Sequence, residues 1–217
     1  MKIAEAVFEI LYLLFAVGMG IWLLSRSHPA VKLTGLIALI LGAGDAFHLV
    51  PRIFDALGPV ADRTVSLGLG KFVTSVTMTL FYLLLEEYRQ MRMGISHSQE
   101  GRRMSNVMLA LCMVRIVLCF LPMNEWTSAN PPLLWGIIRN IPFVSVGTLT
   151  VLNWLQSARI DRVYRFLPLA VTLSFLFYLP VVLLAGTYKM VGMLMLPKTV
   201  MYVWILIMFS RASRETA

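Results

Sequence analysis

Six ionisable side chains lie inside long apolar stretches of the sequence, where a charge is costly. They are Glu9, Asp45, Lys71, Arg115, Arg139 and Lys198. A charge near the centre of a bilayer costs about 2.5–3.5 kcal/mol even on insertion scales, so lipid-facing placement of all six would be prohibitive. We therefore expect these side chains to point into a protein interior, where they could hold a ligand or act as acids and bases.

The apolar stretches themselves are seven in number. Each is about 20 residues long, the length that a helix needs to cross a hydrocarbon core of about 30 Å. Hydrophobic residues make up 59% of the 217 residues, charged residues only 14%, and the mean hydropathy is +0.78, which excludes an ordinary soluble domain. The predicted helices cover 3–24, 33–52, 64–87, 105–122, 133–156, 166–186 and 190–210. The sequence thus predicts an all-α, seven-helix transmembrane bundle that forms one domain over 1–217.

The basic residues are distributed unevenly between the two ends of these helices. One end holds only Lys2, Arg52, Arg63 and Lys189. The other holds eleven: Arg26, Lys32, Arg89, Arg92, Arg102, Arg103, Arg159, Arg162, Arg165, Arg211 and Arg214. The positive-inside rule then predicts an outside N-terminus and a cytoplasmic C-terminus. The net charge of +8 is accounted for by topology, so we expect no nucleic-acid partner.

Helical spacing suggests that the charged side chains converge on one site. A rise of about 1.5 Å per residue from the outer ends puts most of them roughly 8–15 Å below the outer surface. Polar residues at spacings of three, four or seven share a helix face with them. These shared faces are Glu5, Glu9 and Tyr12; Asp45, His48 and Arg52; Lys71, Thr74 and Ser75; Trp135 and Arg139; and Lys198 and Tyr202. The sequence predicts a polar pocket open to the outer face.

The ligand class follows from the charge balance within the helices. Lys71, Arg115, Arg139 and Lys198 outnumber the two carboxylates, so an anionic guest would balance the excess. A membrane lipid or a small organic anion fits better than a cation. The predicted ligand-binding residues are Arg52, Lys71, Arg115, Arg139, Asn140, Tyr178, Lys198 and Tyr202. The alternative is that the charges only pair with one another to fix helix packing, Asp45 with an arginine and Glu9 with a lysine.

The histidines, the cysteines and the two longest connections do not indicate a further site. The histidines lie in different segments, and Cys112 and Cys119, seven residues apart on one helix, are about 10 Å apart. We therefore predict no metal site and no disulfide between these cysteines, and the identity of any cofactor stays unknown. The segment Glu86 to Ser105 is rich in charge and is interpreted as a solvated connector. The proline-rich segment 122–132 is interpreted as an ordered cap over the outer end or, equally, as a rigid turn.

Four strings give the chain a resemblance over nearly its full length. They are GDAFHLVPR at Gly44–Arg52, GKFVTS at Gly70–Ser75, RNIPF at Arg139–Phe143 and MVGMLMLPK at Met190–Lys198. The chain resembles a group of bacterial seven-helix integral membrane proteins with these strings. That resemblance implies the fold and a place in the cytoplasmic membrane of a bacterium. It indicates no activity, and a protein partner stays unknown.

A local likeness points to lipid chemistry. Gly44–Ala46, with Leu49–Arg52 and a following glycine- and phenylalanine-rich helix, is similar to the YhhN-type lysoplasmalogenases, membrane hydrolases of vinyl-ether lysolipids. That likeness implies a catalytic or metal-holding role for Asp45. Those enzymes have eight helices and a late acidic motif, and the sixth and seventh helices here contain no carboxylate.

Three functional hypotheses remain. In the first, a hydrolase or transferase acts on an amphiphile from the outer leaflet, with Asp45 as general base assisted by Glu9 or His48. No G-x-S-x-G or HExxH signature supports a specific mechanism. In the second, a transporter or receptor binds the anion or lipid without chemistry. In the third, Lys198 in the last helix holds retinal, by a faint likeness of Tyr178–Pro180 to microbial rhodopsins.

Overall fold

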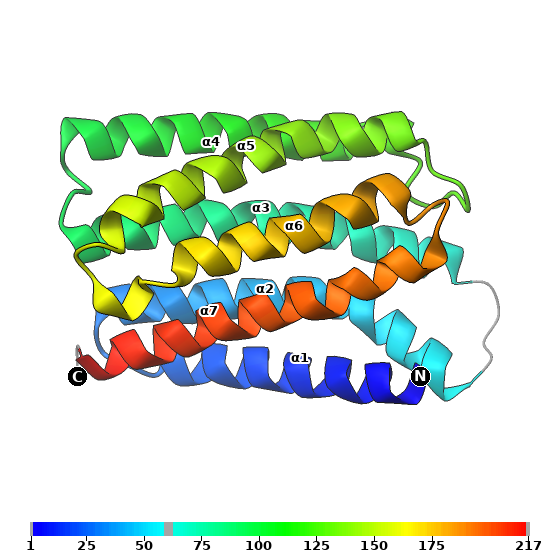
Figure 1. Cartoon of the computed structure of the whole chain (residues 1–217), viewed down its shortest axis with the longest axis horizontal. Helices are drawn as coiled ribbons and strands as arrows, with labels where there is room; N and C mark the ends of the chain where they lie inside the picture. Colours follow the sequence, from blue (N-terminus) through cyan, green and yellow to red (C-terminus); the bar gives the residue numbers. More distant parts are fainter. Residues whose placement is uncertain (1, 59–62, 216–217) are drawn as a thin grey trace.

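A computed structural model describes residues 2–58 and 63–215 of the chain. Seven long helices account for most of it (Figure 1). They are α1 (Lys2–Leu24), α2 (Pro29–Leu57), α3 (Thr64–Met93), α4 (Gln99–Phe120), α5 (Leu133–Ser157), α6 (Leu167–Leu184) and α7 (Met195–Glu215). Three short 3-10 helices lie in the connections: η1 (Pro122–Asn124), η2 (Arg162–Tyr164) and η3 (Lys189–Leu194). Seven helical segments are long and apolar enough to cross a membrane, which confirms the predicted seven-helix membrane fold.

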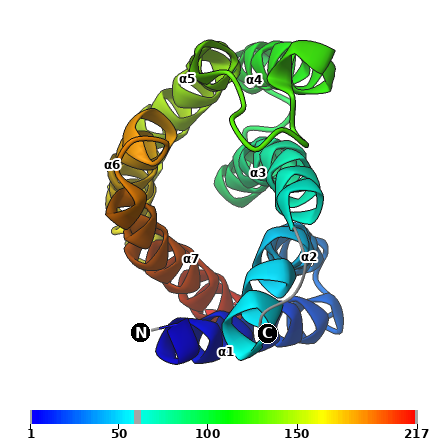
Figure 2. The same ribbon diagram turned by 90° about the vertical axis from the view of Figure 1, so that its right-hand side faces the viewer.

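The helices form a closed ring seen end-on (Figure 2). Each helix packs against the next in the sequence, and α1 packs against α7 to close the ring. Helix α3 also contacts α5 across the bundle, and α2 also contacts α7. Because seven antiparallel segments are connected in order, the two termini lie at opposite ends (Figure 1). We call the end with the N-terminus and η1 the N-terminal face, and the end with η2 and the C-terminus the C-terminal face.

The connection between α3 and α4 is much shorter than predicted. Helix α3 continues to Met93 and stops at Gly94, whose φ of 68° is left-handed and favours glycine. Helix α4 begins after Ser98, whose hydroxyl accepts a hydrogen bond of 2.9 Å from the Gly101 amide. The interpretation of Glu86 to Ser105 as a solvated connector is therefore wrong. Most of that segment is helical, and its first charged residue, Glu86, is completely buried.

A proline bends α2 near the N-terminal face. Pro51 lies inside the helix and has no N–H to donate to the carbonyl of Phe47. Figure 1 shows the last turns of α2 slanting toward α1. This direction brings the end of α2, with Arg52, against the acidic first turns of α1.

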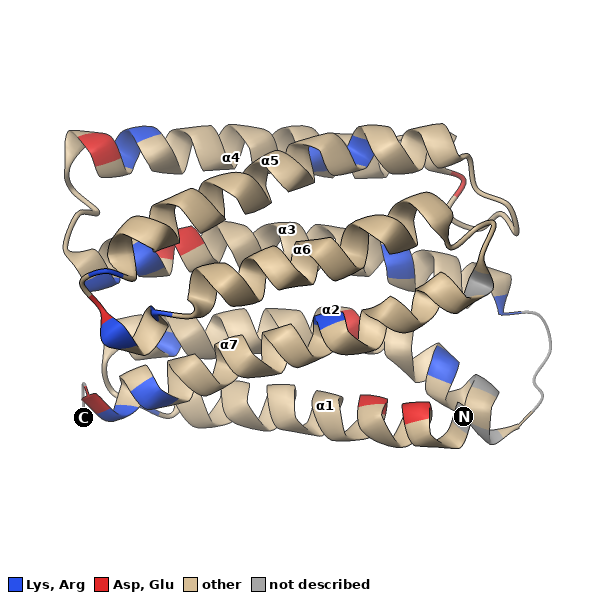
Figure 3. Cartoon of the chain, in the orientation of Figure 1, with Lys and Arg blue, Asp and Glu red and all other residues tan. Residues whose placement is uncertain are grey.

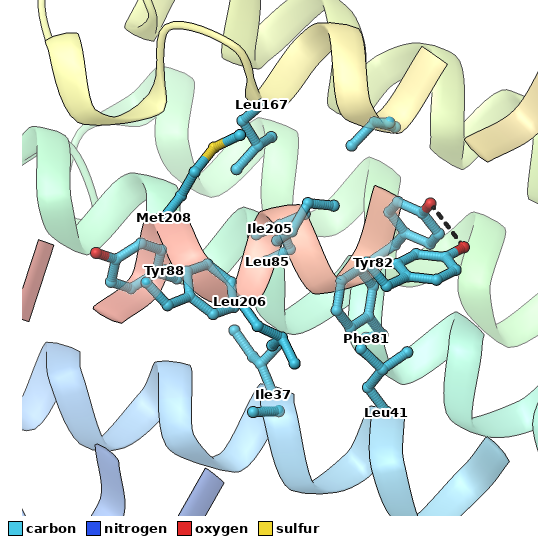
Figure 4. Packing of buried hydrophobic residues seen from close by; sticks show 14 of the residues in the cluster. Ile37, Leu41, Phe81, Tyr82, Leu85, Tyr88, Leu167, Ile205, Leu206 and Met208 are labelled. Atoms are coloured by element: carbon cyan, nitrogen blue, oxygen red, sulfur yellow. Dashed lines mark hydrogen bonds between the residues drawn. The ribbon is translucent and has the colours of Figure 1, made fainter. Parts of the chain in front are cut away.

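An apolar layer fills the middle of the bundle. Figure 4 shows Leu85, Ile205 and Leu206 packed between the ring of Tyr82 on one side and that of Tyr88 on the other. Each of these three aliphatic side chains is fully buried. Polar groups are thus concentrated toward the two ends of the bundle, and Figure 3 shows charged residues at the C-terminal face and in the half nearer the N-terminal face.

Candidate functional site

The six charged residues expected in the interior differ in burial. Glu9, Arg115 and Lys198 are buried, with exposed fractions of 4%, 1% and 7%. Asp45 and Arg139 are partly buried, whereas Lys71 is exposed. Three of the six therefore lie within the packed interior, and the site is built around them.

The acidic face of α1 is paired with an arginine. Arg52 forms ion pairs with Glu5 and with Glu9, the latter at 3.4 Å between Nη2 and Oε1. The lysine partner considered for Glu9 is replaced by this arginine of α2. Glu9 is thus held by a cation, which makes it a poor free base.

Asp45 has a different neighbourhood. Its Oδ2 accepts a hydrogen bond of 2.7 Å from the Tyr12 hydroxyl. The cation that acts on it electrostatically is Lys198. Within residues 2–58 and 63–215 no ion pair within 4.0 Å involves Asp45, so the carboxylate keeps one oxygen available for another donor.

Lys198 lies between two tyrosine rings near the start of α7. Its Nζ is 4.9 Å from the ring centroid of Tyr178 and 5.4 Å from that of Tyr202. Aromatic faces attract an ammonium group, and the attraction grows when water is excluded. The aromatic residues therefore hold the Lys198 ammonium in place.

Arg115 of α4 is the most deeply buried cation of the site. Its guanidinium carbon lies 3.4 Å from the centroid of the Phe143 ring. Its Nε and Nη1 have no hydrogen-bond partner in the described part of the chain. The groups that act on it most strongly are the Tyr178 hydroxyl and the Cys119 thiol, and neither of them is a carboxylate. Arg115 is thus a buried cation with two donors unused.

A tyrosine and amide network connects Arg115 to Lys198. The Tyr178 hydroxyl donates to Asn140 Oδ1 at 2.8 Å, and Asn140 Nδ2 donates to the Gly136 carbonyl at 2.7 Å. The Tyr202 hydroxyl lies 3.4 Å from the Tyr82 hydroxyl. The predicted residues Asn140, Tyr178 and Tyr202 therefore line the same region as the two buried cations.

Arg139, in contrast to Arg115, is held by contacts with the segment 122–132. Its Nη1 donates to Asn124 Oδ1 at 2.8 Å, and its guanidinium carbon lies 4.2 Å from the ring centroid of Trp126. Asn124 and Trp126 in turn donate to carbonyls at the end of α4, including that of Cys119 at 2.9 Å from Trp126 Nε1. Segment 122–132 is therefore an ordered cap fixed to α4 and α5, and Arg139 is part of it.

Lys71 and His48 occupy the edges of the site. Lys71 is exposed on α3 and forms no ion pair within 4.0 Å with the residues that the structure describes. His48 is partly buried, and its Nδ1 has no hydrogen-bond partner among them. Neither residue is hydrogen-bonded to Asp45 within those ranges, so neither is central to the geometry.

The donor set does not suggest a metal ion. No group of three His, Cys, Asp or Glu side chains with suitable placement occurs within the described ranges. Cys112 and Cys119 are both free and buried, as the prediction of no disulfide between them requires.

The sequence interpretation missed a second polar cluster at the C-terminal face. Glu86 accepts two hydrogen bonds from Arg89, at 2.9 and 2.7 Å, and further ones from Gln90 and Asn153. Arg89 also donates to Ser157 of α5. The spacing of Glu86, Arg89 and Gln90 at i, i+3 and i+4 on a helix was the available signal. These residues are saturated with one another and therefore form a structural network.

Comparison with known protein families, curated proteins and solved structures finds no match to this chain.

Proposed function

We propose that this protein binds the anionic group of an amphiphile or lipid in the half of the bundle nearer the N-terminal face, through Arg115 and Lys198. The observation that carries the proposal is Arg115, a buried guanidinium with two donors that have no partner in the described part of the chain. Buried polar groups are nearly always hydrogen-bonded, and buried charges are nearly always paired. A carboxylate or phosphate group would satisfy both needs.

The wider charge balance supports an anion. In this half, Arg52 is neutralised by the α1 carboxylates and Arg139 is held by an amide and an indole ring. Asp45 is the carboxylate available to Lys198, which leaves the charge of Arg115 unbalanced. A planar guanidinium can donate to two oxygens of one anion, so it recognises carboxylate and phosphate well.

The apolar layer supports access from one face. Leu85, Ile205 and Leu206 separate the site from the polar network around Glu86. An ion conductor would need a continuous polar path across the bundle, and this apolar layer interrupts such a path. A site confined to one half favours binding or chemistry on a ligand that enters from that side, which the charge distribution of the sequence predicts to be the outer side of the membrane.

A second candidate is a hydrolase or transferase that acts on the bound lipid. The observation that favours it is Asp45, whose carboxylate accepts from Tyr12 and keeps one oxygen available beside Lys198. Such a carboxylate could act as general base toward water or a substrate hydroxyl. We expect Asp45→Asn to abolish release of aldehyde from a vinyl-ether lysolipid while the fold is retained. Full activity in this variant would remove Asp45 from the mechanism.

The binding proposal is tested by native mass spectrometry of the detergent-purified protein. The probes are oleate and lysophosphatidic acid, with lysophosphatidylcholine as the zwitterionic comparison. The variant is Arg115→Met with Lys198→Met, and the control is Arg102→Met with Arg211→Met, which removes the same charge at exposed positions of the C-terminal face. Hydrogen bonds to charged groups contribute about 1.5–3 kcal/mol each, so we expect the site variant to bind the anionic probes at least about tenfold more weakly.

Three outcomes would contradict the proposal: equal binding of the zwitterionic probe, equal loss in the control, or no binding to the wild type. A visible absorption band on addition of retinal, lost in Lys198→Ala, would replace the proposal with the retinal hypothesis. Uptake of the labelled probe into proteoliposomes would identify a transporter.

A further inference from the structure

A charged hollow lies at the C-terminal face, on the outside of the ring. It is found where α5 turns through η2 into α6, and its volume is about 870 Å³. Its lining residues are Leu155, Ala158, Arg159, Arg162, Arg165 and Phe166. Three of these six are arginines and none is acidic. The hollow lies at the opposite end of the bundle from Arg115 and does not depend on the function proposed above.

The three arginines have no acidic partner within the described part of the chain. No ion pair within 4.0 Å involves any of them in the described ranges. The nearest acidic residue in the sequence, Asp161, accepts a hydrogen bond of 2.8 Å from Arg92 and one of 3.0 Å from the Val163 amide. Its carboxylate is therefore committed to α3 and to the start of η2. The hollow keeps a concentrated positive charge.

An apolar surface continues from the arginines along the helices. Leu155 and Phe166 line the hollow and have exposed fractions of 49% and 48%. Leu152 and Leu169, on the same two helices, are also exposed, at 53% and 47%. The hollow lies where two candidate membrane spans, Leu133–Ser157 and Arg162–Leu184, meet the C-terminal face. Charge is thus placed at the level of lipid headgroups, with apolar side chains toward the acyl region.

We propose that this hollow binds the phosphate of an anionic phospholipid in the leaflet at the C-terminal face. Each planar guanidinium group can donate two hydrogen bonds to the oxygens of one phosphate. The exposed leucines and Phe166 accommodate the glycerol backbone and the first acyl carbons. Basic pockets between helices at a membrane surface suit anionic headgroups in this way. Arg165, 5.4 Å from the Phe166 ring centroid, is held at the rim by a cation–π contact.

The test is native mass spectrometry with phosphatidylglycerol, phosphatidylcholine and soluble glycerol phosphate as probes. The variant is Arg159→Gln, Arg162→Gln and Arg165→Gln. The control is Arg102→Gln, Arg103→Gln and Arg211→Gln, an equal loss of exposed charge at the same face. We expect one tightly held phosphatidylglycerol in the wild type, weakened about tenfold or more in the variant and no more than about threefold in the control. Exposed substitutions of this kind leave the fold intact, which thermal unfolding of both variants verifies.

The remaining arms distinguish this hollow from the Arg115 site and from nonspecific lipid binding. Arg115→Met must leave the phosphatidylglycerol adduct in place, because that residue belongs to the other half of the bundle. An adduct lost in Arg115→Met and kept in the arginine variant would overturn the inference while supporting the function proposed above. Equal loss in variant and control would show a general surface charge effect, and equal retention of phosphatidylcholine would show an acyl-chain effect; either result overturns the inference. Binding of glycerol phosphate as tightly as phosphatidylglycerol would overturn it too, because the hollow would then be a free phosphate site instead of a lipid site.

Discussion

At the scale of single residues, two buried arginines contrast in their surroundings. Arg89 donates twice to the fully buried Glu86, so its charge is compensated within the protein. Arg115 lies against Phe143 and has two donors without a partner among the described residues. Desolvation makes an uncompensated buried charge costly, which is why we interpret the first arginine as structural and the second as functional.

This contrast predicts opposite effects on stability. We expect Arg89→Met to destabilise the protein by about 3–5 kcal/mol, because it leaves Glu86 buried without its cation. Arg115→Met removes a charge that nothing balances, and we expect the ligand-free protein to be equally stable or more stable, by up to about 4 kcal/mol. Thermal unfolding in one detergent, with lipids removed, measures both. Strong destabilisation by Arg115→Met would mean that this guanidinium is a structural element.

The sequence could predict some of these positions and not others. The cost of charges in hydrocarbon was sufficient to place Glu9, Arg115 and Lys198 in the interior, as the structure has them. The same argument failed for Lys71, which is exposed. It could not foresee that Arg139 contacts Asn124 and Trp126, because that contact depends on how segment 122–132 folds back over α4.

At the scale of elements, the cap at the N-terminal face is fitted to α3 by a glycine. The backbone of Trp126 approaches Gly68 so closely that a Cβ there would overlap its carbonyl group. The Trp126 ring packs against Phe72 one turn further along α3, at 5.7 Å between centroids. The cap therefore joins α3 to the end of α4 and to α5 through Arg139.

We expect Gly68→Ala to destabilise the protein by about 1–3 kcal/mol, because the backbone of the cap must shift to make room. Gly18 on α1 is the matched control, since nothing lies within 4 Å of a Cβ built there. Gly18→Ala is expected to change stability by less than about 1 kcal/mol. Equal effects of the two substitutions would contradict this prediction, because they would show that the cap can shift away from Gly68 without cost. In that case, limited proteolysis within 122–132 would be no faster in either variant than in the wild type.

Helix boundaries show where sequence patterns were insufficient. The existence of all seven helices followed from hydropathy, but α3 and α4 extend further toward each other than the apolar stretches do. Gly94 and Ser98 were local signals for the true ends, a left-handed C-cap and an N-cap. The burial of Glu86 was not predictable from α3 alone, because its partner Asn153 belongs to α5 and is brought near only by the α3–α5 contact.

At the scale of the whole molecule, the two ends have different electrostatic character. The half nearer the N-terminal face holds both acidic and basic side chains (Figure 3), whereas most of the arginines of the sequence belong to the C-terminal face. The apolar layer around Leu85, Ile205 and Leu206 separates them. The two binding proposals therefore concern different halves of the bundle and are independent.

The same asymmetry predicts the orientation in the membrane. If the arginine-rich C-terminal face is cytoplasmic, a cysteine in the cap is reached by a membrane-impermeant maleimide added to intact cells, whereas a cysteine between α3 and α4 is not. Thr127→Cys and His97→Cys are suitable because both side chains are exposed, and the native Cys112 and Cys119 are buried. Permeabilised cells should label both variants, which controls for reactivity. The reverse pattern would invert the bundle, so that the half with Arg115 would face the cytoplasm and the proposed ligand would have to come from the inner leaflet or from a soluble metabolite.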